Sequence, residues 1–402
     1  MSLSNGRQYL AIPGPSVVPD RVLNAMHRAS PNIYEGELVE MMPGLITGLK
    51  SIARTRHHCA IYISNGHGAW EAALANVISD GDRVLVLATG RFALGWSEVA
   101  TRMGAVCEII DHGRQAPVNM EKLAAALAAD PDHRIKAVMA VQTDTSTSVR
   151  NDVAAMRATL DAAGHPALLM IDCIASLACD DFHMDDWGVD VMVAACQKGL
   201  MVPPGLGFVF FNDRADRVRE TAGRVTHYWD WRPRGSAEEL WQYFDGTAPT
   251  HHLYGLRESL AMIDEEGLDN VLSRHATLSR MIWAAFDVWG QGGPMQLNIS
   301  DPALRSHAVT AARLGAPHGK ALRDWVTANT GVTLGIGLGM IEPGDPLATG
   351  YFRIGHMGHV NAHMVLGVLA SIDAGLKSMD IPHGRGALDA AAEICAEAVR
   401  KR

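Results

Sequence analysis

Lys198 and Asp172 are the two residues whose types and positions best suit catalysis in this sequence. Lys198 follows an apolar run, 189–196, and precedes a stretch rich in glycine and proline, 199–207. An amine at the mouth of a buried strand is poorly solvated, which lowers its pKa and lets it attack a carbonyl. Asp172 ends another apolar run, 167–172. The pair suits a Schiff-base lysine and a partner for a pyridinium nitrogen, the two groups that pyridoxal 5'-phosphate requires.

A third candidate feature is the short segment 64–68, Ser-Asn-Gly-His-Gly. It follows an expected strand and precedes an expected helix, so its small residues let backbone N–H groups approach an anion at the positive end of the helix. The segment matches neither the dinucleotide-binding fingerprint nor the P-loop, and a plain strand-to-helix turn explains it equally well. The segment precedes Asp172 and Lys198 in the chain, and the joint occurrence of the three features in this order favours a phosphate site.

These residues need a scaffold, and apolar runs of strand length alternate with helical segments from about residue 59 onward. The alternation predicts an α/β fold with a mostly parallel sheet, which binds ligands beyond the carboxyl ends of its strands. We expect seven strands, at residues 60–64, 83–88, 106–111, 135–142, 167–172, 189–194 and 207–211. The clearest helices are expected at residues 69–78, 96–103, 120–129 and 153–163.

The length of 402 residues exceeds what one core usually supports, so two domains are expected. We predict a large domain over residues 21–280 and a smaller α+β domain over residues 281–402, where the regular alternation fades. Residues 1–20 contain Pro13, Pro15 and Pro19, which disfavour a helix, so we expect an extended N-terminal arm.

Composition limits the partners of the chain. The net charge of −9 is spread without acidic or basic blocks, which argues against nucleic acid or an anionic membrane and leaves small metabolites as ligands. The sequence begins without the pattern of a signal peptide and contains no apolar run of membrane-spanning length, so a cytoplasmic protein is expected. The six cysteines have no regular spacing, and we expect no metal site.

Five motifs in order give the chain a resemblance to the class V aminotransferases of pyridoxal-phosphate fold type I, in particular the alanine–glyoxylate and serine–glyoxylate aminotransferases. The resemblance runs from Pro13 to about Gly355 and implies a homodimer with shared active sites. The motifs are Ser-Asn-Gly-His-Gly-Ala-Trp-Glu-Ala-Ala at 64–73, Ile-Asp-Cys-Ile-Ala-Ser at 171–176, Gln-Lys-Gly-Leu at 197–200 with Pro-Pro-Gly at 203–205, Leu-Tyr-Gly-Leu-Arg-Glu-Ser-Leu at 253–260, and Phe-Arg-Ile-Gly-His at 352–356.

The resemblance also implies roles in holding the cofactor. An aromatic ring would stack on the cofactor ring, a hydroxyl would bond its phenolic oxygen, and two backbone amides with a glutamine would hold the phosphate. A threonine would reach the phosphate from the neighbouring subunit. In this chain these positions are occupied by Phe92, Thr145, Gly66, His67, Gln197 and Thr247 respectively.

Two further residues are expected to contact substrate. Arg353 offers a planar guanidinium that binds a carboxylate through two parallel hydrogen bonds, although the residue alone would also suit a structural ion pair. The resemblance implies the substrate role. Tyr34 lies in residues 32–37, Asn-Ile-Tyr-Glu-Gly-Glu, which replace a His-Arg-x-Pro pattern of the serine–glyoxylate relatives and bring an aromatic ring and acids to the entrance.

The resemblance implies a ping-pong transamination that passes through a pyridoxamine phosphate form. Alanine or serine is the expected donor and glyoxylate or another small 2-oxo acid the acceptor. A transaminase of the pyridoxamine–pyruvate or ureidoglycine–glyoxylate type is the alternative, since residues 353–358, Arg-Ile-Gly-His-Met-Gly, also occur in the pyridoxamine type. Asn65 replaces an acidic residue of those relatives, which weighs against them.

Other functions of the same fold are less consistent with the sequence. A cysteine desulfurase needs a mobile cysteine late in the chain, and Cys395 falls in an expected terminal helix. A non-catalytic metabolite sensor predicts loss of the lysine, the aspartate or the arginine, and all three residues are present. A transcriptional regulator would need a DNA-binding domain before residue 20.

Overall fold

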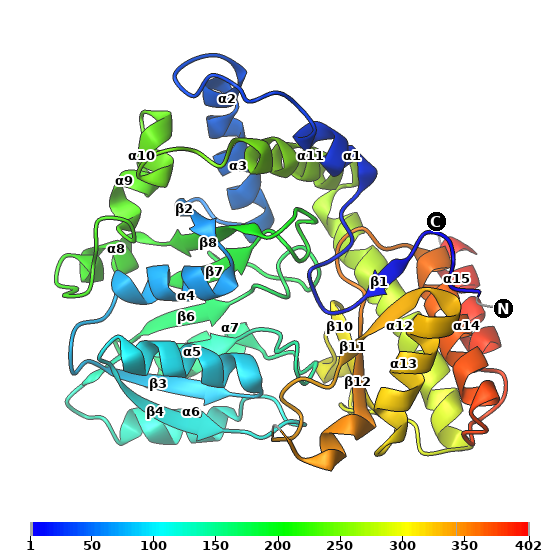
Figure 1. The fold of residues 1–402 in the computed structure, drawn as a ribbon. Coiled ribbons are helices and arrows are strands. Elements are labelled where there is room, and N and C mark those ends of the chain that lie inside the picture. The colour runs from blue at the N-terminus through cyan, green and yellow to red at the C-terminus, as the bar shows by residue number, and fades with distance from the viewer. Residues whose placement is uncertain (1–2, 343, 401–402) are drawn as a thin grey trace.

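Two β-sheets organise the molecule, whose computed structural model describes residues 3–342 and 344–400 (Figure 1). The larger sheet has seven strands in the order β2-β8-β7-β6-β5-β3-β4. Neighbouring strands are parallel except where β8 pairs with β2 and with β7. The strands are β2 (His58–Ser64), β3 (Arg83–Ala88), β4 (Val106–Asp111), β5 (Ile135–Val141), β6 (Leu168–Asp172), β7 (Val191–Ala195) and β8 (Gly205–Phe211).

Helices cover both faces of this sheet, as the strand–helix alternation predicts. Alternate side chains of β3, Val84 and Val86, pack in one core with α4 and α5, while Leu85 and Leu87 pack in the other with α3, α6 and α7. The fold class expected from the sequence is therefore confirmed. The five helices are α3 (Met42–Ala53), α4 (Gly66–Ala75), α5 (Arg91–Arg102), α6 (Met120–Ala128) and α7 (Val153–Ala162).

Some predicted boundaries are wrong by a few residues, for identifiable reasons. Helix α4 begins at Gly66 rather than at residue 69, because the side chain of Asn65 accepts hydrogen bonds from the amides of His67 and Gly68 and caps the helix. Strand β7 begins at Val191 rather than at residue 189. Here the Asp190 carboxylate accepts a hydrogen bond from the Leu169 amide and ties the start of β6 to the preceding loop.

The smaller sheet has five strands in the order β1-β11-β12-β10-β9 and lies beside the carboxyl ends of the large sheet (Figure 1). The expected N-terminal arm contributes the edge strand β1, which pairs in parallel with β11. The proposed domain boundary at residue 280 lies inside the long helix α12 and stays a prediction. The strands are β1 (Tyr9–Ala11), β9 (Gln296–Leu297), β10 (Val309–Arg313), β11 (Val332–Ile336) and β12 (Tyr351–Gly355).

Helices α12 to α15 enclose a third core around this sheet. They are α12 (Leu268–Gln291), α13 (His318–Thr330), α14 (Ala362–Ser378) and α15 (Ala387–Arg400). The remaining helices lie above the β2 edge of the large sheet and at its left side in Figure 1. They are α1 (Asp20–Met26), α2 (Glu37–Glu40), α8 (Asp213–Arg219), α9 (Trp231–Gly235), α10 (Leu240–Phe244) and α11 (Thr250–Glu266). Within residues 3–342 and 344–400, no helix has the length and apolarity that crossing a membrane requires.

Candidate active site

A cavity of about 120 Å³ lies where the parallel strands end, and seven of the residues predicted from the sequence line it. They come from the segments that follow β2, β3, β5, β6 and β7, because parallel strands deliver their carboxyl ends to one edge of the sheet. The seven residues are Gly66, His67, Phe92, Thr145, Asp172, Gln197 and Lys198.

Lys198 is held against the N-terminal arm. Its Nζ donates a hydrogen bond of 2.5 Å to the carbonyl of Pro13, and its own carbonyl accepts one of 2.7 Å from the Ser16 hydroxyl. Gly14 has φ +96°, and a Cβ there would lie 2.3 Å from Nζ, so the residue must be glycine for the arm to approach this closely. This role of the arm was not predicted, because no local signal links the arm to a lysine so far along the chain.

The environment of Lys198 favours its neutral form. Burial lowers the pKa of the amine to about 8, and the positive charge of Arg353 acts in the same direction. An amine with this pKa is neutral in about a tenth of the molecules at pH 7, a far larger fraction than for an ordinary lysine. Lys198 therefore meets the requirement for a nucleophile that attacks a carbonyl.

Asp172 is almost fully buried at the end of β6. It accepts hydrogen bonds of 2.7 Å from the Ile174 amide and 2.9 Å from Trp70 Nε1. Burial raises the pKa of its carboxyl group to about 7, although these two hydrogen bonds favour the charged form. A cation placed in the cavity would restore the ionised carboxylate, which is the behaviour required of a partner for a protonated ring nitrogen.

Two residues that the sequence analysis did not single out support these groups. Trp70 orients Asp172, and its ring stacks on Trp96 and meets Phe92 edge-on with centroids 6.4 Å apart. Asp144 is fully buried and accepts hydrogen bonds from the Phe92 amide and from both the amide and hydroxyl of Ser146. Asp144 therefore fixes the start of α5 and the position of the Phe92 ring. Trp70 stands within a quoted motif, but only a structure reveals its partner.

The start of α4 and Gln197 form the part of the cavity suited to an anion. The His67 amide already donates to the Asn65 cap, at 3.0 Å, so an anion would have to share it. The Gly66 amide has no hydrogen bond within the described residues, and a Cβ on Gly66 would lie 2.5 Å from Ile174. The Gln197 side chain forms no hydrogen bond there, so its Nε2 can donate to an anion, while its buried acceptor Oε1 would need a donor from elsewhere.

Arg353, on β12 of the smaller sheet, does not line the cavity but lies beside it, in contact with the lining residue Thr145. Its Nη1 donates a hydrogen bond of 2.7 Å to the carbonyl of Thr145, and its Nε donates one of 2.6 Å to the carbonyl of Ile336. Burial lowers the pKa of the guanidinium to about 10, so the group remains charged at neutral pH. Two of its nitrogens position the side chain, which leaves Nη2 and the second N–H of Nη1 for an incoming carboxylate.

Thr247 and Tyr34 do not line this cavity. Thr247 is exposed three residues before α11 begins, and Tyr34 is 87% exposed in the segment that precedes α2. The contacts predicted for these two residues are not formed within one copy of the described chain. The other predicted residues lie together at the sheet edge or, for Arg353, beside it.

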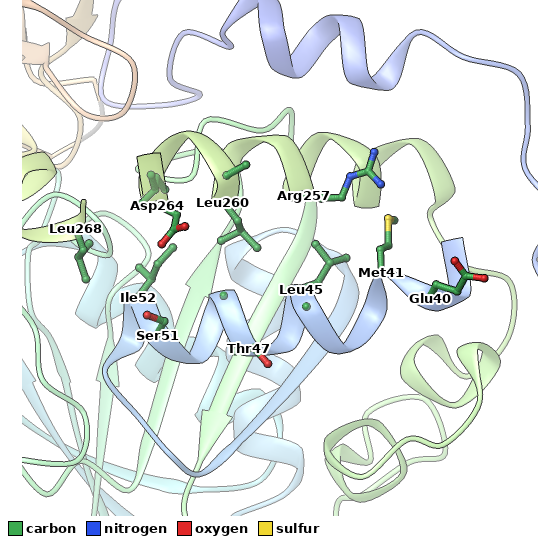
Figure 2. Close-up of a pocket in the computed structure, with 14 residues that line it drawn as sticks. Glu40, Met41, Leu45, Thr47, Ser51, Ile52, Arg257, Leu260, Asp264 and Leu268 are labelled. Carbon is green, nitrogen blue, oxygen red and sulfur yellow. The ribbon is translucent and has the colours of Figure 1, made fainter. Parts of the chain in front are cut away.

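A much larger hollow, of about 640 Å³, lies between α3 and α11 (Figure 2). Figure 2 shows side chains of the two helices facing each other, with Leu45 and Ile52 on α3 and Leu260 on α11. Charged residues, Glu40 and Arg257 among them, stand at one end. We call this hollow the α3–α11 groove. It contains none of the predicted catalytic or cofactor-binding residues.

Comparisons with known proteins agree with this geometry. The model of the family Aminotransferase class-V matches residues 8–338. The chain is 35% identical to a serine–glyoxylate aminotransferase of Arabidopsis thaliana over 96% of this chain and 94% of that protein. It is 33% identical to an L-aspartate–glyoxylate aminotransferase of Paracoccus denitrificans, over 95% and 94% of the two chains. Its structure is similar to that of a ureidoglycine–glyoxylate aminotransferase from Bacillus subtilis, with TM-score 0.86 and 25% identity over 98% and 100% of the two chains.

Proposed function

The chain belongs to the class V aminotransferase family, and on this premise we propose that it transfers the amino group of alanine or serine to glyoxylate or another small 2-oxo acid. It is a transaminase that depends on pyridoxal 5'-phosphate, as the members of its family do. One observation carries the assignment of residues: Lys198 and Asp172 line the same cavity, one with a lowered pKa and the other with a raised pKa. This combination suits a nucleophilic amine facing a ring that must stay protonated.

The residues of the cavity fit the cofactor. Gln197 through the N–H groups of its Nε2, together with the Gly66 amide, would hold the phosphate, with the His67 amide shared between the phosphate and the Asn65 cap. Phe92 would cover one face of the ring, and Thr145 would meet its phenolic oxygen. When bound, pyridoxal 5'-phosphate supplies an aldehyde carbon and an electron-withdrawing ring that stabilises a carbanion.

Lys198 acts first as the nucleophile and then as the base. With the cofactor bound, Nζ of Lys198 would hold its aldehyde carbon, and the amine, once free, would accept the α-proton of the substrate. Asp172 acts by holding a proton on the ring nitrogen, and Trp70 keeps its Oδ2 in place. In the second half-reaction the same Nζ would deliver a proton to the α-carbon of the oxo acid that receives the amino group.

Arg353 acts as the clamp for the substrate carboxylate. The hydrogen bonds to Thr145 and Ile336 fix the plane of its guanidinium, so a bidentate carboxylate pair forms without further ordering of the side chain. Because both the amino acid and the oxo acid carry an α-carboxylate, one arginine serves both half-reactions. Glyoxylate as acceptor is supported by the names of all three relatives reported above.

The identity of the amino donor is the part of the proposal for which an alternative exists. The relatives are named for serine, for L-aspartate and for ureidoglycine. A donor of the ureidoglycine or pyridoxamine type is the alternative, supported by the similarity to the Bacillus subtilis structure and by the sequence of residues 353–358. Asn65, the cap of α4, weighs against the pyridoxamine type, since the relatives of that type carry an acidic residue in this loop.

We also propose a homodimer with shared active sites, in which a second copy of the chain covers the α3–α11 groove. The groove has an apolar centre with charged residues at its end, which is the anatomy of a protein interface. Thr247 precedes α11, and Tyr34 precedes α2, so both exposed residues belong to segments that lead into the helices beside the groove. Each would serve the cavity of the partner.

A cytoplasmic location is the further proposal that the cysteines support. All six are free and lie within the described part of the chain, and four of them are buried. Free buried thiols are typical of a reducing compartment. Fractionation of the source cells with a tagged chain tests this, and recovery of the protein in an oxidising compartment would contradict it.

The experiment that tests the function is a half-reaction. Cofactor-loaded protein is mixed with one donor at a time and no acceptor, and the visible absorbance of the loaded protein is followed. Alanine or serine should remove this absorbance fastest and yield the matching oxo acid, and glyoxylate should then restore it. Fastest loss with ureidoglycine or pyridoxamine would favour the alternative, and no loss with any donor would overturn the proposal. Lys198→Ala is the control that should show no conversion.

A further inference from the structure

A separate polar cleft of about 460 Å³ lies between the two sheets. The loop after β4 provides one wall with His112 and Arg114, and the smaller sheet provides the other with Asn298 and Arg313. Met340 and Tyr351 complete it, and none of its lining residues lines the cavity of Lys198. The cleft has no part in the mechanism derived above.

The polar groups of this cleft are mostly hydrogen-bond donors. The Arg313 side chain is exposed and forms no ion pair or hydrogen bond within the residues that the structure describes. Arg114 has only a distant carboxylate, Asp111 Oδ1 at 3.7 Å, and keeps free nitrogens beyond the Nε that bonds the Gly339 carbonyl. Two guanidinium groups therefore share this cleft with one weakly placed acid.

His112 adds a donor without a partner. Its Nδ1 accepts a hydrogen bond from the Asn119 amide, so the proton of the neutral ring lies on Nε2. Nε2 is buried and has no hydrogen-bond partner within the described residues. A buried polar atom without a partner costs free energy, and such atoms mark positions where a ligand or water completes the site.

We propose that this cleft binds a small metabolite through its carboxylate or phosphate groups. Arginines form bidentate pairs with both kinds of oxyanion, and two of them on facing walls suit a ligand that carries more than one negative oxygen group. The volume lies within the range of small-molecule sites. The site is distinct from the pocket for the α-carboxylate, which Arg353 provides.

Hydrogen bonds join the two walls of the cleft, and the pairing of β10 with β12, in which Arg313 lies opposite Tyr351, leads from the cleft to the strand of the substrate clamp. Asn298 Nδ2 donates to the Arg114 carbonyl at 2.7 Å, and Arg114 Nε donates to the Gly339 carbonyl at 3.0 Å. Tyr351 lies two residues before Arg353 on β12. A bound anion that draws Arg114 and Arg313 together therefore steadies the strand that carries the clamp, so it should strengthen the binding of the oxo acid.

The test uses cofactor-loaded protein, whose own phosphate site is filled, in the presence of a saturating amino acid together with its matching oxo acid, so that Arg353 stays occupied in both forms of the enzyme. Citrate and inorganic phosphate are titrated separately while thermal unfolding is followed, with sodium chloride at matched ionic strength. We expect a saturable rise in Tm with at least one anion and none with chloride, since a ligand that binds the native state raises Tm. The two arms distinguish carboxylate from phosphate recognition, and no saturable rise with either anion would overturn the proposal.

Arg313→Gln is the decisive variant, because Arg313 has no partner whose loss would unfold the chain. It should weaken anion binding at least about tenfold. Arg280→Gln, at an exposed arginine of α12 outside the cleft, should bind the anion as the unmodified protein does. Equal anion binding by Arg313→Gln and the unmodified protein would place the anion elsewhere and overturn the proposal.

Steady-state kinetics test whether the anion in the cleft strengthens the binding of the oxo acid. A saturating anion should lower the KM for the oxo acid severalfold in the unmodified protein and leave it unchanged in Arg313→Gln. A competitive rise in KM would instead show that the anion occupies the Arg353 pocket, which contradicts the proposal.

Discussion

The cavity of Lys198 and the α3–α11 groove differ in size and in chemistry. The groove measures about 640 Å³ and the cavity about 120 Å³, yet the residues with catalytic potential line the smaller space. In the groove, Arg257 is 39% exposed and pairs with Glu37 at 2.7 Å. In the cavity, Asp172 is 2% exposed and faces a lysine whose partner is only a backbone carbonyl. Reactivity in this molecule therefore follows the removal of water rather than the size of a hollow.

The difference has a simple physical origin. An exposed ion keeps its hydration water, and an ion pair at the surface contributes little free energy. The charged residues of the groove can therefore affect solubility and the association of chains, but they are not activated for catalysis. An amine or carboxyl group that has lost its water changes its proton affinity. Substitutions of matched type in the two regions should consequently have very unequal effects on turnover.

The largest effect that separates the regions is expected from Asp172→Asn. Removing this charge should lower kcat roughly 10²- to 10³-fold, because the ring nitrogen loses the partner that keeps it protonated. Asp264→Asn, in the groove, should leave kcat within about twofold. Steady-state kinetics with thermal unfolding as the control for folding measure both. Equal effects at the two sites would show that the buried cavity and the exposed groove do not differ in their importance for turnover.

Arg353→Lys should give the next largest effect, on KM rather than on kcat. Lysine keeps the charge but cannot form the planar bidentate pair, so KM for both amino acid and oxo acid should rise about 10- to 100-fold. Arg257→Lys in the groove is the matched control and should leave both KM values within about twofold. A fall in kcat with unchanged KM would show that Arg353 does not bind the substrate carboxylate.

The pH dependence of cofactor capture sharpens the contrast further. Because only the neutral amine attacks, the rate at which cofactor-free protein takes up pyridoxal 5'-phosphate should rise with pH through the pKa of Lys198, about 8. The neutral fraction then grows about tenfold between pH 7 and pH 9. Arg353→Gln should move the midpoint upward, since the charge of Arg353 helps to lower this pKa, whereas Arg257→Gln should not. A midpoint above 10 in the unmodified protein would contradict the assigned environment.

The smallest effect is expected where the groove meets its proposed partner. A Cβ on Gly44 would meet no atom within 4 Å, so Gly44→Glu introduces a charge into the groove without a clash inside one chain. It should raise the dissociation constant of the dimer about fivefold, or about 1 kcal/mol, because the carboxylate loses water on association. Gly44→Ala is the control, and sedimentation at several concentrations is the measurement. A monomeric unmodified protein would refute the interface.

The sequence predicted those parts of the site that follow local rules. Lys198 and Asp172 each end an apolar run, and parallel strands bring such ends together, so their meeting followed from the strand pattern. The contact between Lys198 and the carbonyl of Pro13 did not, because nothing local to either residue encodes a pairing between positions 185 residues apart. The hydrogen bond from Trp70 to Asp172 was missed for the same reason.

Boundaries were predicted less well where a side chain rather than an apolar run decides them. Because Asn65 caps it, α4 starts earlier in the chain than expected. Helix α5 starts at Arg91, five residues before the expected start at 96, because the buried carboxylate of Asp144 accepts a hydrogen bond from the Phe92 amide. In both cases a short polar side chain pairs with backbone amides that the apolar pattern does not report.

Reduction of the cofactor-loaded protein with borohydride, followed by peptide mapping, tests the central claim most directly. The claim is that the amine of Lys198, whose pKa is lowered by its surroundings, bonds covalently to the cofactor. Borohydride should fix one cofactor per chain on the peptide that carries Lys198. In Lys198→Ala it should fix none, although that variant should still hold cofactor noncovalently and should lack turnover. Cofactor fixed on another lysine, or undiminished turnover in Lys198→Ala, would contradict the account.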